Sequence, residues 1–355
     1  MKRTTLRNYN TLTFIYRSEK VVSTKNLENY SKIVSENLEN CVNSFSTGIK
    51  PFYSGKVRES YEIDDGSFAL VTTDRQSAFD RILASVPFKG QVLNLTSAWW
   101  FEKTHHIVES HLLSIPDPNV SLVKRCKPFP VEFVVRGYIT GSSNTSLWVN
   151  YAKGIRKYCG IDFPDGLNKN QKLENVVITP TTKSDEGDVP ISPEEIVDQG
   201  LMTQSHWDYC SAKAVELFKY GQHEAEKKGF ILVDTKYEMG LSAEGEVLLI
   251  DELHSPDSSR YWRLNSYETR YNEGKEPENI DKEFLRLWFK DNCDPYKDEK
   301  LPEAPTELIV ELALRYIQIY EELTGSKFDF PSRNEDVNLR VSNVLKDLGG
   351  REKGQ

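Results

Sequence analysis

Lys236, Glu238 and Asp251, in the second half of the chain, are residues whose types and spacing suit the binding of a metal–phosphate complex. The segment 231–250 contains two apolar runs separated by turn residues, which predicts a β-hairpin. A turn centred between residues 244 and 245 places Glu238 opposite Asp251, with their Cβ atoms about 5 Å apart. Two carboxylates at that distance repel unless they share a cation, and Mg²⁺ with a nucleotide is the commonest case. The pattern therefore predicts that Glu238 and Asp251 bind Mg²⁺ beside Lys236.

A polar turn at residues 255–260 follows the hairpin and contains Asp257 and Arg260. The arginine side chain can bind a phosphate or a carboxylate through two parallel hydrogen bonds. The alternative is a surface hairpin with solvated acids and a turn arginine. The crowding of acids, a lysine and an arginine into one short segment favours a binding site.

A glycine–lysine pair, Gly55-Lys56, opens a second predicted hairpin, over residues 52–74. Its turn is Asp64-Asp65-Gly66, a strong hairpin signal. Glycine lets a backbone approach a phosphate closely, and the lysine that follows can reach the anion. The pair does not match the P-loop pattern, and most such pairs are simple turns.

Charged residues also follow the predicted strand ends, where loops often carry function. Asp74, Arg75 and Ser77 come directly after one apolar run, and a salt-bridged surface loop is an equal alternative there. Arg136 ends the apolar run 131–135, and the loop containing Ser142 leads into a predicted helix, an arrangement that suits a phosphate. The alternative is a capped helix and an arginine in a salt bridge.

The segment Thr179–Lys183 precedes the acidic run 184–188. A flexible charged loop of this kind can close over a site, or it can be a solvated connection. We include Lys183 among the candidate substrate residues.

The composition limits the classes of function. The formal net charge is −9 over 355 residues, which disfavours nucleic acid as a partner. Five scattered cysteines without a CxxC pair fit neither a disulfide framework nor a zinc ribbon. No apolar run approaches the roughly 20 residues that a membrane helix needs, so we expect no membrane partner.

The two ends of the chain differ from the middle. Residues 1–45 form a polar extension whose first 25 residues carry one acid, Glu19, against six basic residues, a composition typical of organelle transit peptides. A cytoplasmic protein with a disordered or loosely helical tail is the equal alternative. Residues 331–355 are predicted to form a loose polar tail, with a short helix near residues 341–348.

Eight motifs occur in order and together resemble the SAICAR synthetase family, most closely its plant-like form. They are SGKVRESYE, TTDRQSAFDR, PFKGQVLN, FVVRGYITGSSNTSLW, TPTTK, LVDTKYEMG, LIDELHSPDSSRYW and DKEFLRLWFKDN. The match runs from about residue 50 to about residue 330. Met239 departs from the family pattern, which more often has an aromatic residue there.

The resemblance implies an ATP-dependent ligase of purine biosynthesis. ATP would activate the carboxylate of carboxyaminoimidazole ribotide (CAIR), and the amine of L-aspartate would displace phosphate. The implied fold is α+β with two lobes, related in layout to the kinase and ATP-grasp folds. An antiparallel-sheet lobe at residues 46–128 would bind ATP, and a larger lobe at residues 129–330 would hold the ribotide. The oligomeric state stays open.

The resemblance also assigns roles to the residues above. Lys236, Glu238 and Asp251 would be catalytic, and Gly55 and Lys56 would bind ATP together with the two metal-binding carboxylates. The residues implied for CAIR or aspartate are Asp74, Arg75, Ser77, Arg136, Ser142, Lys183, Asp257 and Arg260.

Two rival functions come from other classes. A kinase-like phosphotransferase would need HRD and DFG motifs, and the sequence has neither. A nucleotide-binding regulatory module without catalysis is the other rival. The presence of Lys56, Lys236, Glu238, Asp251 and Arg260 argues against it.

Overall fold

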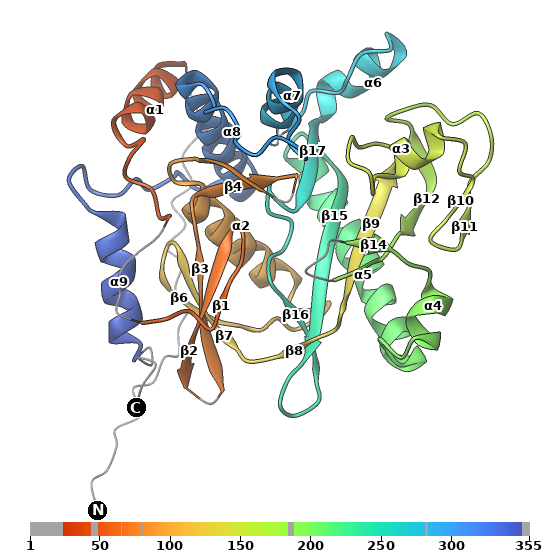
Figure 1. The fold of residues 1–355 in the computed structure, drawn as a ribbon, viewed down its shortest axis with the longest axis horizontal. Coiled ribbons are helices and arrows are strands. Elements are labelled where there is room, and N and C mark those ends of the chain that lie inside the picture. Colours follow the sequence, from red (N-terminus) through yellow and green to blue (C-terminus); the bar gives the residue numbers. More distant parts are fainter. Residues whose placement is uncertain are drawn as a thin grey trace, which may run out of the picture.

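A computed structural model describes residues 24–43, 49–64, 66–79, 81–183, 188–280 and 283–349. It confirms the predicted α+β class and the two lobes, each built on an antiparallel sheet (Figure 1). None of the helices within these ranges is long and apolar enough to cross a membrane.

The N-terminal lobe is a sheet with strand order β1-β2-β3-β7-β6. Its strands are β1 (Tyr53–Ser54), β2 (Arg58–Asp64), β3 (Ser67–Thr72), β6 (Leu112–Asp117) and β7 (Val120–Lys124). The hairpin β4 (Arg75–Ala78) and β5 (Arg81–Ser85) follows β3, and helix α2 (Lys89–Thr104) packs on the sheet. The predicted hairpin over residues 52–74 is therefore confirmed.

The larger lobe is an eight-stranded sheet centred on the adjacent strands β9 (Val131–Tyr138) and β15 (Phe230–Leu241). The strands around them are β8 (Lys127–Pro128), β12 (Lys172–Ile178), β13 (Thr181–Thr182), β14 (Val189–Pro190), β16 (Val247–Ile250) and β17 (Ser259–Arg263). A small ribbon, β10 (Lys157–Tyr158) and β11 (Ile161–Asp162), stands apart from it.

Helix α5 (Gln204–Lys227) covers one face of the larger sheet (Figure 1). Its buried residues Leu217 and Phe218 share a core with Phe133, Val135 and Tyr237 of β9 and β15. Strand residues alternate between faces, so the opposite face carries the polar residues between them. The remaining helices of this lobe are α3 (Leu147–Ala152), α4 (Pro193–Asp198), α6 (Leu264–Asn272) and α7 (Glu283–Asn292).

Both ends of the chain contribute to the fold, which corrects part of the prediction. Helix α1 (Thr24–Glu36) lies within the predicted polar extension, but its Tyr30 and Val34 are buried in a core shared with α8 (Thr306–Thr324). The expectation for residues 1–23 lies outside the described residues.

The predicted loose tail is also wrong between residues 337 and 347, which form helix α9 (Val337–Asp347) on the N-terminal lobe (Figure 1). Val337, Val341 and Leu345 recur every four residues and pack with Val71 of β3. This stripe is the helical period that buries one face. A helix near residues 341–348 was expected, and its presence is confirmed.

We predict that Leu345→Ala lowers the free energy of unfolding by about 2–5 kcal/mol, because it opens a cavity under a fully buried side chain. Urea unfolding measures this change. The matched control is Leu339→Ala in the same helix, whose side chain is 57% exposed. Equal effects of the two substitutions would show that α9 does not pack on the sheet.

Candidate active site

The hairpin predicted from residues 231–250 exists, but its register differs by one residue from the prediction. Glu238 pairs with Ile250, so it does not face Asp251 across the ladder. The turn holds three residues between Ser242 and Glu246, whose backbone N–H and C=O are bonded at 2.9 Å. The prediction assumed a turn of two residues. A turn of three residues shifts the cross-strand partner of every residue in the hairpin by one position.

Glu238 and Asp251 nevertheless meet at one cation, Lys236. Asp251 leaves β16 with a left-handed φ of 66°. The Lys236 Nζ lies 2.5 Å from Glu238 Oε1, 3.3 Å from Asp251 Oδ2 and 3.2 Å from Glu132 Oε1. The predicted grouping of the lysine and the two carboxylates is present, with a lysine between the carboxylates.

Two further cations contact the outer oxygens of these carboxylates. Arg58 of β2 forms an ion pair with Asp251 and lies 3.5 Å from Glu252. Lys183 forms an ion pair with Glu238. Arg58 therefore brings the N-terminal lobe to the site, and the sequence analysis did not select it.

The charges around Asp251 determine its ionisation. Burial would raise its pKa, but Arg58, Lys236 and Lys183 together hold the pKa well below its usual range. Burial would lower the pKa of Lys236, but its carboxylate neighbours, Glu238 first, raise it well above the usual value. The site therefore keeps Asp251 ionised and Lys236 protonated at neutral pH.

The donor set fits a hard cation that also binds phosphates. No group of three or more His, Cys, Asp or Glu side chains in the described residues is arranged to hold a metal on its own. Two carboxylates converge on one positive charge, however, and Mg²⁺ commonly uses one or two carboxylates with the remaining ligands from phosphates and water. Glu238 and Asp251 match that use.

Beside this cluster is a cavity of about 180 Å³ lined by Arg136, Arg260 and Arg286. Arg136 Nη1 lies 3.4 Å from Asp234 Oδ2, and Arg260 forms an ion pair with the same carboxylate. Arg136, Asp234 and Arg260 are neighbours because they lie on adjacent strands: Asp234 of β15 pairs with Arg136 on β9 and with Arg260 on β17. The guanidinium groups are the donors in this cavity that suit an anion. Its lining balances four basic residues, Arg136, Lys236, Arg260 and Arg286, against four acidic ones, Glu132, Asp188, Asp234 and Asp257. We call this cavity the arginine pocket.

The loop after β9 borders the arginine pocket, but the predicted Ser142 is not among the residues that line it. Ser143, Thr145 and Ser146 line it, while the Ser142 carbonyl accepts a hydrogen bond from Lys290 at 3.2 Å. Asp257, predicted as a substrate residue, does line the pocket.

The Gly55-Lys56 turn connects β1 to β2 directly before Arg58. Arg75 donates hydrogen bonds to the Gly55 and Lys56 carbonyls, both at 3.0 Å, and forms an ion pair with Glu59. Lys56 is exposed. The structure thus places Arg75 as a support for this turn, away from the arginine pocket.

Asp74 and Ser77 are also away from the arginine pocket. The Asp74 carboxylate accepts the N–H groups of Val42 and Gly90, both at 2.7 Å, and burial raises its pKa to about 6. These bonds join the N-terminal segment to the start of α2. Ser77 is half-buried in β4.

The sequence analysis missed four charged residues at the site: Arg58, Glu132, Asp234 and Arg286. Strand periodicity gives a signal for two of them. Glu132 lies four residues before Arg136 in one strand, and Asp234 lies two before Lys236, so each shares a face with a residue that was selected.

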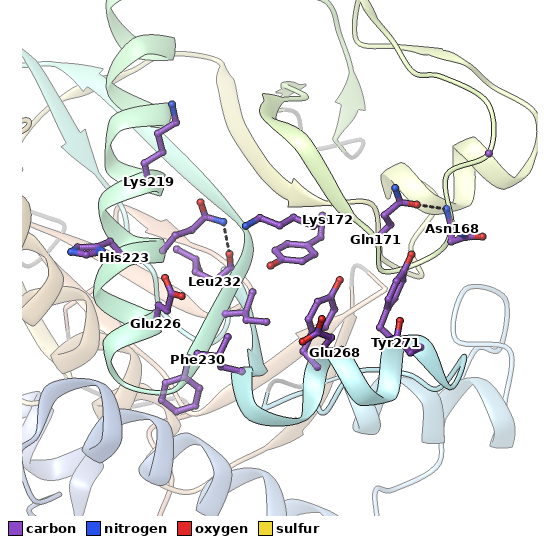
Figure 2. Close-up of a pocket in the computed structure, with 17 residues that line it drawn as sticks. Asn168, Gln171, Lys172, Lys219, His223, Glu226, Phe230, Leu232, Glu268 and Tyr271 are labelled. Carbon is purple, nitrogen blue, oxygen red and sulfur yellow. Dashed lines mark hydrogen bonds between the residues drawn. The ribbon is translucent and has the colours of Figure 1, made fainter.

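A larger cavity, of about 960 Å³, lies elsewhere, between α5, α6 and the start of β15 (Figure 2). Figure 2 shows Lys219, His223 and Glu226 on α5, with Glu268 and Tyr271 on α6. None of its lining residues lines the arginine pocket. The size of a cavity therefore does not identify the candidate active site; the clustering of charged side chains does.

The loop from Asp251 to Arg260 is anchored from behind by His254, which is fully buried. Its Nε2 bonds to the Tyr237 hydroxyl, and its carbonyl accepts a hydrogen bond from Tyr261 at 2.7 Å. Gly221 of α5 makes room for the ring, since a Cβ there would lie 2.3 Å from His254 Cε1. Burial lowers the pKa of His254 to about 3.

We predict that His254→Phe weakens the pH dependence of stability. Between about pH 6.5 and pH 3 the unfolded chain protonates His254 and the folded chain does not, so stability falls as pH falls. The substitution should reduce that slope by about 1.4 kcal/mol per pH unit. Urea unfolding from pH 6 to pH 4 measures it, with exposed His106→Phe as the control. An unchanged slope in His254→Phe would show that His254 is not buried in its neutral form.

Comparisons with known proteins show which family the chain resembles. A family model described as SAICAR synthetase matches residues 51–303. Phosphoribosylaminoimidazole-succinocarboxamide synthase of Legionella pneumophila strain Paris is 61% identical over 310 residues, which covers 87% of this chain and 99% of the relative. The chloroplastic enzyme of Arabidopsis thaliana is 57% identical over 314 residues, covering 87% of this chain and 76% of the relative.

A solved structure of SAICAR synthase from Saccharomyces cerevisiae, complexed with SAICAR, has the same fold. Its TM-score is 0.71 at 32% sequence identity, and the match covers 81% of this chain and 100% of the yeast chain. The resemblance predicted from the eight motifs is confirmed, and its relatives include bacterial as well as plant forms. The chain belongs to the SAICAR synthetase family.

Proposed function

We propose that this chain is a phosphoribosylaminoimidazole-succinocarboxamide synthase. It joins the carboxylate of CAIR to the amine of L-aspartate and converts ATP to ADP and phosphate. The observation that carries the proposal is the ion-paired Lys236–Glu238–Asp251 cluster beside the arginine pocket. Relatives at 61% and 57% identity are named for this activity.

The reaction needs two bond exchanges. The γ-phosphoryl group of ATP passes to a carboxylate oxygen of CAIR, which creates an acyl phosphate with a good leaving group. The aspartate amine then attacks the acyl carbon, the C–O bond to phosphate breaks, and the nitrogen loses a proton. Alignment and charge neutralisation supply most of the catalysis, and water must be kept from the acyl phosphate.

Glu238 and Asp251 would hold Mg²⁺, which would neutralise charge on the ATP phosphates when bound. Lys236 already contacts both carboxylates and would keep positive charge beside the transferred phosphoryl group. Gly55 and Lys56 would approach the ATP phosphates from the N-terminal lobe, on a turn supported by Arg75.

The arginine pocket would bind the 5′-phosphate of CAIR. Arg136, Arg260 and Arg286 provide the positive charge, and Ser143, Thr145 and Ser146 of the loop after β9 provide hydroxyl groups. Asp257 would accept a hydrogen bond from the ribose or the exocyclic amine. Lys183 is exposed to 46% and lies at the outer side of Glu238, where an incoming aspartate carboxylate or phosphate can replace that contact.

The two rival functions give different products. A phosphotransferase acting on a hydroxyl would not need aspartate, and a regulatory module would bind ATP without turnover. The names of the relatives favour neither.

The test of the proposal is one assay. Purified protein with ATP, Mg²⁺ and CAIR should release ADP and form a new amide in equal amounts only when L-aspartate is added. Amide and ADP are measured by chromatography. ADP release with no dependence on aspartate would favour a phosphotransferase, and tight ATP binding without turnover would favour the regulatory module.

We predict that Asp251→Asn lowers kcat by at least about 100-fold, because the change removes a carboxylate that would hold the Mg²⁺ neutralising the phosphoryl group. Steady-state assay measures the loss, and circular dichroism checks the fold. The matched control is Asp198→Asn on α4, an exposed carboxylate outside the site. An Asp251→Asn enzyme as active as the Asp198→Asn enzyme would refute the metal role of Asp251.

We place the enzyme in the cytoplasm, with a plastid or other organelle as the alternative. Two relatives are named as chloroplastic, from Arabidopsis thaliana and Vigna aconitifolia. The basic composition of the first 25 residues supports the alternative.

A further inference from the structure

Asp257 lines the arginine pocket, but its carboxylate is held from the opposite side by residues of three other elements. Its side chain is only 7% exposed. Lys89, the first residue of α2 and fully buried, lies 3.4 Å from Asp257 Oδ2. The Tyr316 hydroxyl of α8 lies 3.2 Å from Oδ1, and the Gln76 amide of β4 lies 3.5 Å from it.

Tyr316 is the neutral donor best placed to direct the Asp257 carboxylate. It is fully buried, and its hydroxyl lies 3.1 Å from Gln76 Oε1 as well as 3.2 Å from Asp257 Oδ1. A hydroxyl has one proton, and a hydrogen bond to a carboxylate is stronger than one to an amide oxygen. The proton is therefore best used on Asp257, while Gln76 donates from its amide nitrogen.

Helix α8 is itself fixed by the N-terminal helix. The Tyr30 hydroxyl of α1 donates to Glu321 Oε1 at 2.9 Å, and the same oxygen accepts the Phe328 N–H at 2.7 Å. The Tyr30 ring also packs on Phe330 with 5.0 Å between centroids. Both α1 and α8 lie outside residues 51–303, the part matched by the family model.

We propose that Tyr316 is a positioning residue for the ligase reaction: it orients the Asp257 carboxylate toward the ribotide. The inference rests on the proposed function, because it assigns Asp257 to CAIR. Helix α8, which lies beyond the residues matched by the family model, would then contribute to substrate binding through the Tyr316 hydroxyl group.

The test is Tyr316→Phe, which keeps the ring and removes the hydroxyl. We expect the KM for CAIR to rise about 10-fold, the size expected for one lost hydrogen bond to a charged group. The KM for ATP should stay within about 2-fold of wild type, since the Tyr316 hydroxyl contacts Gln76 and Asp257 on the ribotide side. Equal increases in both KM values would overturn the proposal in favour of a general loosening of the fold.

The matched control is Tyr320→Phe, one turn along the same helix. The Tyr320 ring packs on Phe328 at 5.8 Å between centroids, away from Asp257. Its KM for CAIR should equal that of wild type. A Tyr316→Phe enzyme that behaves like the Tyr320→Phe enzyme would overturn the inference while leaving the proposed function intact.

A double-substitution cycle separates positioning from a direct contact with substrate. In an Asp257→Ala enzyme, adding Tyr316→Phe should change the KM for CAIR by less than about 2-fold, because the group that Tyr316 orients is gone. A full 10-fold effect in that background would overturn the proposal. Absence of aspartate-dependent amide formation in the wild type would instead refute the proposed function.

Discussion

The site depends on one partly buried ammonium group, that of Lys236, which is shared by Glu132, Glu238 and Asp251. Charges that are removed from water destabilise the folded state unless they are paired. Removing one partner of such a group is strongly destabilising, because it leaves a charge uncompensated. Arg58 completes the compensation from the other lobe. The folded chain thus holds three carboxylates around one lysine, and the packing of the sheet beneath them offsets the energetic cost of bringing these charges together.

Strand alternation supplies that packing without disturbing the charges. On β9 and β15 the residues Phe133 and Tyr237 are paired and lie in the core under α5, while Val134 and Lys236 are paired on the other face. The Arg136–Asp234 pair continues the same polar face. The Lys236 cluster and the arginine pocket are therefore neighbours on one face, separated by about two strand residues. A phosphoryl donor and a phosphorylated acceptor bound to that face would meet between them.

The sequence predicts the residues of this face well where charged residues recur at strand spacing. It predicts them poorly where a contact between residues far apart in the sequence brings them to the site. Lys236, Glu238 and Asp251 were found from spacing, although the turn length moved the register by one residue. Arg58 was not predicted because its partner, Asp251, lies 193 residues away in the sequence, in the other lobe. Arg75 shows the converse error, since a charged residue after a strand looks the same whether it binds substrate or supports a neighbouring turn.

The ends of the chain follow from the same argument. Their polar composition predicted an extension and a tail, because composition averages over a helix whose single apolar stripe is enough to bury it. Tyr30, Val341 and Leu345 occupy such stripes and are buried. Once α1 holds α8, the Tyr316 hydroxyl is fixed behind Asp257, and a helix outside the matched core supports a residue that lines the arginine pocket. In this fold the outer helices stabilise the lobes and also limit how the pocket can be arranged.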